Sequence, residues 1–302
     1  MGLGLLDGRK DHSRLELIRH LLIHLRLHYQ ILLAPIFIWG YFLANGRPDR
    51  DFWLAFLAFH IFLYGGITAF NSYYDRDEGP VGGLAKPPPV TQALLPFSLV
   101  VQGLGIVLAA WVNNSFLAIY LMIFGLGLAY SHPRTRLKGR PLAGLFTVGL
   151  GQGVLASLGG WVAARPELGQ VDGLSLIGIL AITLITVGFY PLTQIYQIEE
   201  DLDRGDLTFA AWRGPKGTFR FAITVQAAAA LMLVGVVGQL LGWANALVVA
   251  VVYGILAAAT IRWSHTFDGG RILENYRRIM AINTVSSLGF MSFIALHLFQ
   301  VF

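Results

Sequence analysis

The stretch that decides the fold is FAITVQAAAALMLVGVVGQLL, residues 221–241. It carries no charged side chain, and a helix of about 20 such residues crosses the roughly 30 Å of hydrocarbon in a bilayer. Similar apolar runs recur along the chain, near 27–45, 52–74, 93–112, 116–131, 143–164, 174–197, 219–241, 244–262 and 279–301. We therefore expect an all-α polytopic membrane protein whose nine transmembrane helices form a bundle.

The composition excludes a water-soluble chain. Of 302 residues, 55% are hydrophobic and 13% are charged, whereas about a quarter of the residues of a soluble domain are charged. The chain contains no cysteine, which excludes disulfides, thiolate nucleophiles and zinc–thiolate sites. We expect two parts, a basic, interfacial cytoplasmic segment at residues 1–26 and a single transmembrane domain at residues 27–302.

The distribution of Lys and Arg predicts the orientation. With nine spans, alternate connections lie on opposite sides, and of the 22 Lys and Arg residues only Arg47, Arg50 and Arg165 fall on the side opposite the amino terminus. The positive-inside rule places the amino terminus in the cytoplasm and the carboxyl terminus outside. We expect the protein in the cell membrane of a bacterium or an archaeon. The net charge of +5 then reflects topology and contact with anionic membrane lipid, so no nucleic-acid partner is expected.

Acidic residues form two clusters on this same side. The first reads NSYYDRDE, residues 71–78, and the second reads QIEEDLDRGD, residues 197–206. On a continuing helix, Asn71, Asp75 and Glu78 share one face, and in the second cluster Gln197, Glu200 and Asp201 form a similar stripe. Carboxylate and amide oxygens suit Mg²⁺, which bridges acidic side chains to phosphate oxygens. Solvated helix ends are the plainer interpretation of each cluster alone.

A basic loop follows the fourth span on the same side. It reads YSHPRTRLKGR, residues 130–140. Its cations can hold the loop in the cytoplasm, but Arg side chains also grip phosphate oxygens, and Tyr130 can donate a hydrogen bond. The loop is therefore a candidate diphosphate-binding segment.

A weak internal repeat in the sequence favours an architecture of two four-helix repeats followed by one further helix. Asn71 and Gln197 are separated by the same interval as Asp75 and Asp201, and YSH at 130–132 recurs as WSH at 263–265. Repeats in membrane bundles commonly place a ligand where the halves meet.

Together these features resemble the UbiA superfamily of intramembrane prenyltransferases, over essentially the whole chain. The resemblance rests on the nine spans, the Asn71-x-x-x-Asp75 start of an NxxxDxxxD motif, the Tyr130…Lys138 loop, and Glu199-Glu200-Asp201…Gly205. It implies a bundle that holds a prenyl diphosphate, two acidic motifs that bind Mg²⁺, and a hydrophobic acceptor that is prenylated. The chain departs from the family pattern at Gly79 and Gln197, where acidic residues are usual, which indicates a variant metal site.

The resemblance, with the residue chemistry above, assigns the expected roles. Prenyl transfer requires ionisation of an allylic C–O bond, so charge on the departing diphosphate must be stabilised. The expected catalytic residues are Asn71, Asp75, Tyr130 and Asp201. The expected metal ligands are Asn71, Asp75, Glu78, Glu200 and Asp201. The expected substrate-binding residues are Tyr74, Arg134, Arg136, Lys138, Tyr196 and Gln197.

Two other functions remain open. A membrane terpene cyclase would use the same ionisation without an acceptor, and a transporter of a lipophilic anion would use the internal repeat and the polar residues within the spans. Clustering of the acids at one interface argues against a transporter. The acceptor is equally open, because a quinone-ring precursor, a tetrapyrrole, a carotenoid end or a lipid headgroup is compatible. Polar residues within spans that can contact an acceptor or bond between helices are Gln102, Gln152, Gln226 and Asn283.

Overall fold

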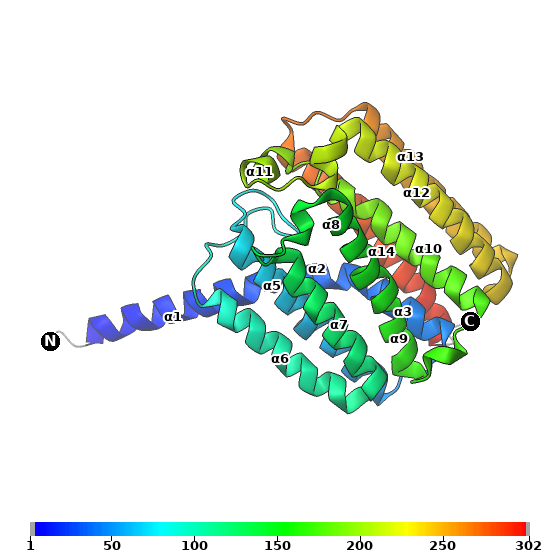
Figure 1. Ribbon diagram of the computed structural model, residues 1–302, viewed down its shortest axis with the longest axis horizontal. Coiled ribbons are helices and arrows are strands. Elements are labelled where there is room, and N and C mark those ends of the chain that lie inside the picture. Colours follow the sequence, from blue (N-terminus) through cyan, green and yellow to red (C-terminus); the bar gives the residue numbers. More distant parts are fainter. Residues whose placement is uncertain (1–3, 300–302) are drawn as a thin grey trace.

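The computed structural model describes residues 4–299, with side chains from residue 14 onward, and this part of the chain contains helices and no strand. Figure 1 shows the helices side by side in one bundle, apart from α1, which extends away from it. In chain order they are α1 (Gly4–His24), α2 (Leu27–Gln30), η1 (Ile31–Leu33), α3 (Ala34–Leu43), α4 (Arg50–Leu57), η2 (Ala58–Leu63), α5 (Tyr64–Asp75), α6 (Leu94–Val112), α7 (Asn114–Ser131), η3 (Leu137–Gly139), α8 (Pro141–Val148), η4 (Gly149–Leu155), α9 (Ala156–Ala164), η5 (Leu168–Gln170), α10 (Gly173–Phe189), η6 (Tyr190–Thr193), α11 (Ile198–Asp203), α12 (Phe209–Leu241), α13 (Trp243–His265) and α14 (Ile272–Leu298).

The prediction of nine membrane spans is confirmed. Nine helical segments of the described chain are long and apolar enough to cross a bilayer, and the chain is an integral, multi-pass membrane protein. Large apolar side chains face outward on several of them, as expected where lipid replaces water. The segments are Arg14–Leu43, Arg50–Asp75, Leu94–Val112, Asn114–Ser131, Pro141–Ala164, Gly173–Thr193, Phe209–Leu241, Trp243–His265 and Ile272–Leu298. The division into two four-helix repeats stays a prediction.

Short polar residues between the apolar runs fix where the helices begin. Asn113 accepts a hydrogen bond from the backbone N–H of Phe116 at 2.8 Å, and Asp172 accepts one from Ser175 at 2.9 Å. These side chains satisfy N–H groups that the first turn of a helix leaves without a partner. A turn of only one residue therefore separates α6 from α7.

The centre of the bundle depends on a close crossing of α3 and α9. A Cβ atom added at Gly40 would collide with the carbonyl of Ser157, and one added at Gly160 would collide with the carbonyl of Phe37. Glycine at both positions lets the two backbones approach, as small residues do at interfaces between membrane helices. Large aromatic side chains, including Phe37 and Trp161, are buried around this crossing.

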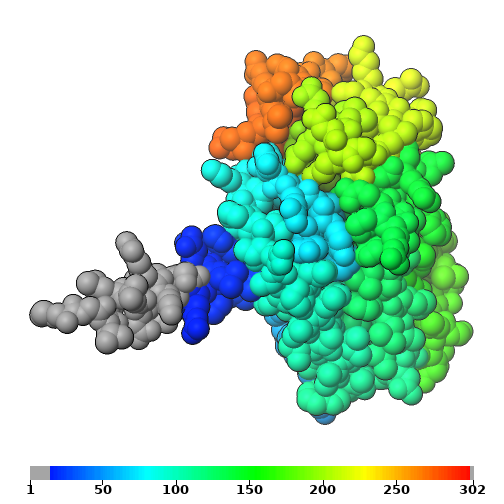
Figure 2. Space-filling model, turned by 60° about the vertical axis from the view of Figure 1, so that its left-hand side comes forward, coloured from blue at the N-terminus to red at the C-terminus, as the bar shows by residue number. Residues whose placement is uncertain are grey.

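The helical segment Arg14–Leu43 is broken at Arg26, which the sequence did not predict. Arg26 adopts a left-handed conformation with φ of 50°, so α1 ends at His24 and the chain changes direction before α2. From residue 14 onward, α1 consequently projects from the side of the bundle (Figures 1 and 2). The expected interfacial segment, residues 1–26, ends at this break, which places Arg26 inside the bundle.

The seventh span also differs from its prediction. Helix α12 begins at Phe209, ten residues before the expected start, and bends at Gly214, whose φ of 65° and ψ of 171° are not helical. Pro215 follows, and its ring cannot continue a regular hydrogen-bond ladder. Because α12 starts before the bend, only residues 204–208 separate it from α11.

Candidate active site

Helix α5 presents the first acidic motif at its end. Asp75 is the last residue of the helix, because Arg76 adopts a left-handed conformation with φ of 53°. One turn earlier, the Asn71 amide donates a hydrogen bond to Ser131 Oγ on α7 at 2.9 Å. Asn71 and Asp75 both line a cavity inside the bundle. Since the helix stops at Asp75, the face that they share does not extend to Glu78.

The second acidic motif lies on the short helix α11. The backbone N–H of Asp201 donates to the carbonyl of Gln197 at 2.8 Å, and both residues line the same cavity. The chain then turns at Gly205, where φ is 79°, so that the N–H of Asp206 also returns to Asp201, at 2.8 Å from its carbonyl oxygen. This turn buries the Asp206 side chain.

Arg204 joins the two motifs. Its Nη1 atom lies 2.5 Å from Asp77 Oδ1, and its Nη2 atom lies 2.8 Å from Asp201 Oδ1. A second contact runs beside it, where the backbone N–H of Glu78 donates to Glu200 Oε1 at 3.3 Å. Acidic segments that are more than a hundred residues apart in the sequence therefore meet at one end of the cavity.

The basic loop after α7 closes over this end. Lys138 Nζ forms an ion pair with Asp75 Oδ2, and Arg136 Nη2 lies 3.5 Å from Asp75 Oδ1. Arg136 also makes a two-pronged contact with Asp206, at 2.6 and 2.7 Å. The loop is thus tied to both acidic motifs, and buried anionic and cationic groups balance one another.

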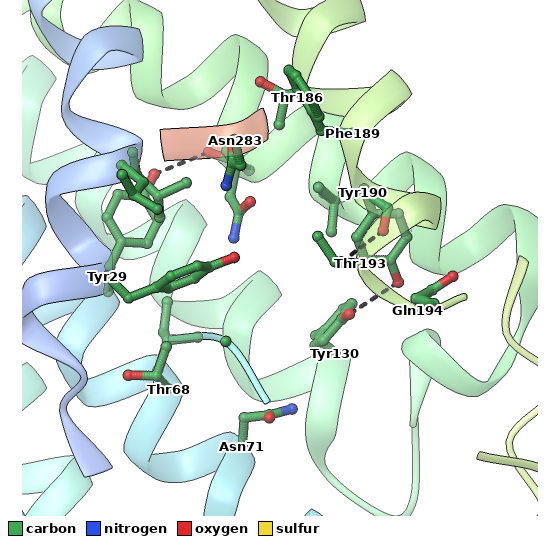
Figure 3. Close-up of a pocket in the computed structure, with 18 of the residues that line it drawn as sticks. Tyr29, Thr68, Asn71, Tyr130, Thr186, Phe189, Tyr190, Thr193, Gln194 and Asn283 are labelled. Atoms are coloured by element: carbon green, nitrogen blue, oxygen red, sulfur yellow. Dashed lines mark hydrogen bonds between the residues drawn. The ribbon is translucent and has the colours of Figure 1, made fainter. Parts of the chain in front are cut away.

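The cavity itself has a volume of about 280 Å³ and changes in character along its length. Charged groups gather where α5 and α11 end, and leucine, isoleucine and phenylalanine side chains line the remainder together with uncharged polar groups. The hydroxyls of Tyr130 and Tyr190 lie 2.9 Å apart on one wall, and Tyr29 and Asn283 reach into the same space (Figure 3). A ligand with a charged head and an apolar tail matches this arrangement.

The predicted site residues divide into two groups. Asn71, Asp75, Tyr130, Lys138, Tyr196, Gln197 and Asp201 line the cavity. Tyr74, Glu78, Arg134, Arg136 and Glu200 do not. Among the second group, Arg136 and Glu200 contact the cavity-lining residues, Tyr74 packs its ring against His132, and Arg134 is exposed.

The sequence did not single out three charged residues at this end of the cavity. Arg26 is buried, donates from Nη2 to Ser72 Oγ at 2.7 Å and lines the cavity. Asp77 and Arg204 also line it. Nothing in the sequence distinguishes Arg26 from the topological cations of the amino-terminal segment, because only the left-handed turn directs it inward.

Burial changes the acidity of Asp201. Desolvation raises its pKa to about 6, although the hydrogen bond and the charge of Arg204 act in the opposite direction. The carboxylate is therefore near its titration point at slightly acidic pH.

The oxygen atoms at this end of the cavity suit a hard divalent cation such as Mg²⁺. Asp75 Oδ1 and Asp77 Oδ2 are buried and accept no hydrogen bond within residues 14–299. Lys138 and Arg204 hold the other oxygen of each carboxylate. No three acidic or histidine side chains in the described part of the chain are grouped closely enough to hold a metal as they stand. The donors fit Mg²⁺, and a bound ion would share the carboxylates with these cations or displace them.

Comparisons with known proteins agree with this geometry. The UbiA prenyltransferase family matches residues 33–283. The protoheme IX farnesyltransferase of Aeropyrum pernix is 30% identical over 147 residues, which are 46% of this chain and 47% of that protein. The chain thus matches about half the length of this curated relative.

Solved structures show the same fold. A UbiA homolog from Aeropyrum pernix K1 superposes with a TM-score of 0.65 at 23% identity, over 88% of this chain and 98% of that one. A UbiA homolog from Archaeoglobus fulgidus, solved with GPP and Mg²⁺ bound, gives 0.62 at 20% identity, over 90% and 99%. The nine-helix bundle, the convergent acidic motifs and the family match lead to one conclusion: the chain belongs to the UbiA prenyltransferase family.

Proposed function

We propose that this protein is a Mg²⁺-dependent intramembrane prenyltransferase, which moves a polyisoprenyl group from an allylic diphosphate to a hydrophobic acceptor. The observation that carries the proposal is the bridge from Arg204 to Asp77 and Asp201, which joins both acidic motifs at the charged end of an otherwise apolar cavity. The Archaeoglobus fulgidus homolog that was solved with GPP and Mg²⁺ supports it.

The charged end of the cavity would bind the diphosphate. Lys138 and Arg136 carry N–H donors that match phosphate oxygens, and the Tyr130 hydroxyl, on the cavity wall, can donate a further hydrogen bond. The cavity-lining residues that would supply oxygen ligands are Asn71, Asp75, Asp77, Gln197 and Asp201. Mg²⁺, when bound there, would neutralise negative charge on the leaving diphosphate. Glu78 and Glu200, just outside the cavity, would complete the acidic surroundings.

The aromatic side chains nearby suit the organic half of the reaction. Breaking the C–O bond leaves an allylic cation, which is stabilised by the electron-rich faces of aromatic rings and requires the exclusion of water. Tyr29, Tyr130, Tyr190 and Tyr196 line the cavity next to the charged residues. Beyond them, apolar side chains can hold the tail, because each buried methylene contributes about 0.8 kcal/mol. Tyr74 does not line the cavity and packs its ring against His132 of the basic loop.

The proposal includes an orientation. The abundance of Lys and Arg on the amino-terminal side places the charged end of the cavity, the ends of α5 and α11, at the cytoplasmic face. A water-soluble diphosphate head would then enter from the cytoplasm, and the tail and the acceptor would come from the lipid.

Reconstituted protein tests the function directly. Purified protein in lipid nanodiscs is incubated with geranyl or farnesyl diphosphate, Mg²⁺ and a panel of aromatic and lipid acceptors, and pyrophosphate and products are measured. We expect pyrophosphate release that depends on both Mg²⁺ and an acceptor. Release without any acceptor, with a cyclic hydrocarbon as product, would identify a terpene cyclase. Transmembrane flux of the anion without cleavage would identify a transporter.

A further inference from the structure

Two uncharged amide side chains face the cavity at membrane depth. Gln152 lies in the π-helical turn η4, and Asn283 lies on α14. Both line the cavity. Each comes eleven residues after the start of its membrane segment, Pro141 and Ile272, so at about 1.5 Å per residue both lie about 17 Å along their helices. They line different walls of the cavity.

The other two polar candidates within the spans are used in helix packing. Gln102 is fully buried, donates to the carbonyl of Ser98 at 3.1 Å, and packs on Gly66. Gln226 is 8% exposed and packs its side chain against Gly188 of α10. Neither lines the cavity. The structure thus separates two amides that pack between helices from two that face a ligand space.

The backbone of η4 is built to direct Gln152 inward. A Cβ atom at Gly153 would lie 2.7 Å from Thr183 Cγ2, and one at Gly149 would lie 2.9 Å from Val187 Cγ2, so both glycines let η4 pack closely on α10. A π-helical turn inserts an extra residue into a helix, and such turns occur frequently at functional sites. The Gln152 side chain lines the cavity from this turn and makes no hydrogen bond with the described residues.

Asn283 belongs to a polar stripe on α14. Ser286 and Ser287 lie on the same face and line the cavity with it. The Ser287 hydroxyl lies 3.4 Å from Asn283 Oδ1, while the NH₂ group of Asn283 has no partner within the described chain. Figure 3 shows Asn283 across the cavity from Tyr130. The Asn283 amide therefore offers N–H donors to a ligand in the cavity.

The charges of the cavity limit what these amides can bind. Its lining cations are Arg26, Lys138 and Arg204, and each contacts Ser72 or an acidic residue at the charged end. No cation lines the cavity on the α14 face or in η4. A carboxylate or phosphate placed between Gln152 and Asn283 would be buried without a counter-ion, which is strongly unfavourable. Hydroxyl and carbonyl groups would find both donors and acceptors there.

We propose that Gln152 and Asn283 bind the acceptor and select an uncharged molecule that carries hydroxyl or carbonyl oxygens, such as a hydroquinone, a phenol or an alcohol. The proposal rests on the proposed prenyl transfer. The acceptor ring lies between the two amides and the tyrosines next to the diphosphate end. Its reacting atom then faces the allylic carbon, and the prenyl tail follows the apolar walls.

Binding measurements without turnover test this selection. The probes are an alkylated hydroquinone and an alkylated benzoic acid of matched size, titrated against the protein in nanodiscs. The variants are Gln152→Met and Asn283→Leu, which preserve volume, with Gln226→Leu as the control for loss of an amide that does not face the cavity. We expect wild type to prefer the hydroquinone, and each cavity variant to raise its dissociation constant about tenfold, as loss of one or two hydrogen bonds does. Gln226→Leu should bind like wild type.

Further readouts separate ligand recognition from structural roles and from the function itself. The melting temperatures of Gln152→Met and Asn283→Leu should match or exceed that of wild type, because neither amide supports packing. In the same samples, Mg²⁺-dependent binding of a non-cleavable geranyl thiolodiphosphate reports on the proposed function.

Binding of that analogue with unchanged hydroquinone affinity in both variants would overturn the acceptor proposal alone. Preference for the benzoic acid, lost in Arg26→Gln, would overturn it in favour of an anionic acceptor. Failure of wild type to bind the analogue would instead refute the prenyltransferase.

Discussion

Arg136 holds Asp206 through two parallel hydrogen bonds, Nε to Oδ1 at 2.6 Å and Nη2 to Oδ2 at 2.7 Å. The contact fastens the basic loop after α7 to the turn between α11 and α12. The backbone N–H of Leu207 donates to the carbonyl of Gly139 at 3.1 Å and reinforces the attachment. Asp206 therefore positions the loop that carries Lys138, although it does not line the cavity itself.

Replacement of Asp206 by Asn should loosen this loop. The amide cannot match the charge or the two-acceptor geometry of the carboxylate, and Arg136 loses its partner. We expect the KM for the prenyl diphosphate to rise about tenfold, while kcat at saturating substrate falls less. Steady-state kinetics with varied diphosphate measure both. Equal losses in kcat and in kcat/KM would show that Asp206 acts in the chemical step instead.

Asp75→Asn and Asp201→Asn should each abolish turnover. Both remove a carboxylate that lines the cavity at the expected Mg²⁺ site, and we expect kcat to fall by at least about a hundredfold. Asp203→Asn is the matched control, because Asp203 lies on the same short helix but is exposed and does not line the cavity. Pyrophosphate release and circular dichroism are measured together. Near-normal rates in either of the first two variants would remove the metal assignment.

Two cations of the basic loop, Lys138 and Arg134, should differ in their effect on the KM for the prenyl diphosphate. Lys138 pairs with Asp75 inside the cavity, whereas Arg134 is exposed and does not line it. We expect Lys138→Gln to raise the KM for the diphosphate about tenfold or more, and Arg134→Gln to change it less than about twofold. Similar effects in the two variants would mean that the loop contributes only a diffuse positive field.

Gly79 should matter because of Glu200. A Cβ atom at position 79 would lie 2.9 Å from Glu200 Oε2, so the glycine leaves room for that carboxylate. If Glu200 contributes to the metal site, Gly79→Ala should raise the Mg²⁺ concentration for half-maximal activity about fivefold, a typical effect of disturbing groups around a metal. Gly103→Ala on α6, which has nothing within 4 Å of its added Cβ, is the control. An unaltered Mg²⁺ dependence in Gly79→Ala would place Glu200 outside the metal site.

The raised pKa of Asp201, about 6 against an ordinary 3.8, has a stability consequence in the absence of Mg²⁺. Between these values the folded protein keeps a proton that the unfolded chain has lost, so this group makes the protein less stable as pH rises from about 4 to 6. Asp201→Asn removes this contribution. Its melting temperature should match wild type near pH 4 and exceed it near pH 7. A difference between the two proteins that does not change with pH would contradict the assigned pKa.

Much of the fold could be predicted from the sequence, because a long apolar segment in a bilayer must satisfy its backbone hydrogen bonds internally and therefore forms a helix. The acidic residues that face the cavity were harder to predict, because helical spacing places residues on one face only while the helix is unbroken. Helix α5 stops at Asp75, so Glu78 leaves the shared face. Helix α11 starts only at Ile198, with Gln197 in a non-helical conformation, so Glu200 does not join Gln197 and Asp201 in the cavity. Arg26 required a left-handed turn that no local pattern reveals.

During synthesis, the first acidic motif leaves the ribosome long before Arg204, which lies beyond the sixth span. Until then Asp77 has neither its guanidinium partner nor the facing carboxylate of Asp201. A nascent chain that ends before Arg204 therefore lacks the second acidic motif of the proposed site. Under the proposed function, cleavage of a prenyl diphosphate requires translation of this acidic turn and of the later spans, which contribute Tyr253 and Asn283 to the cavity.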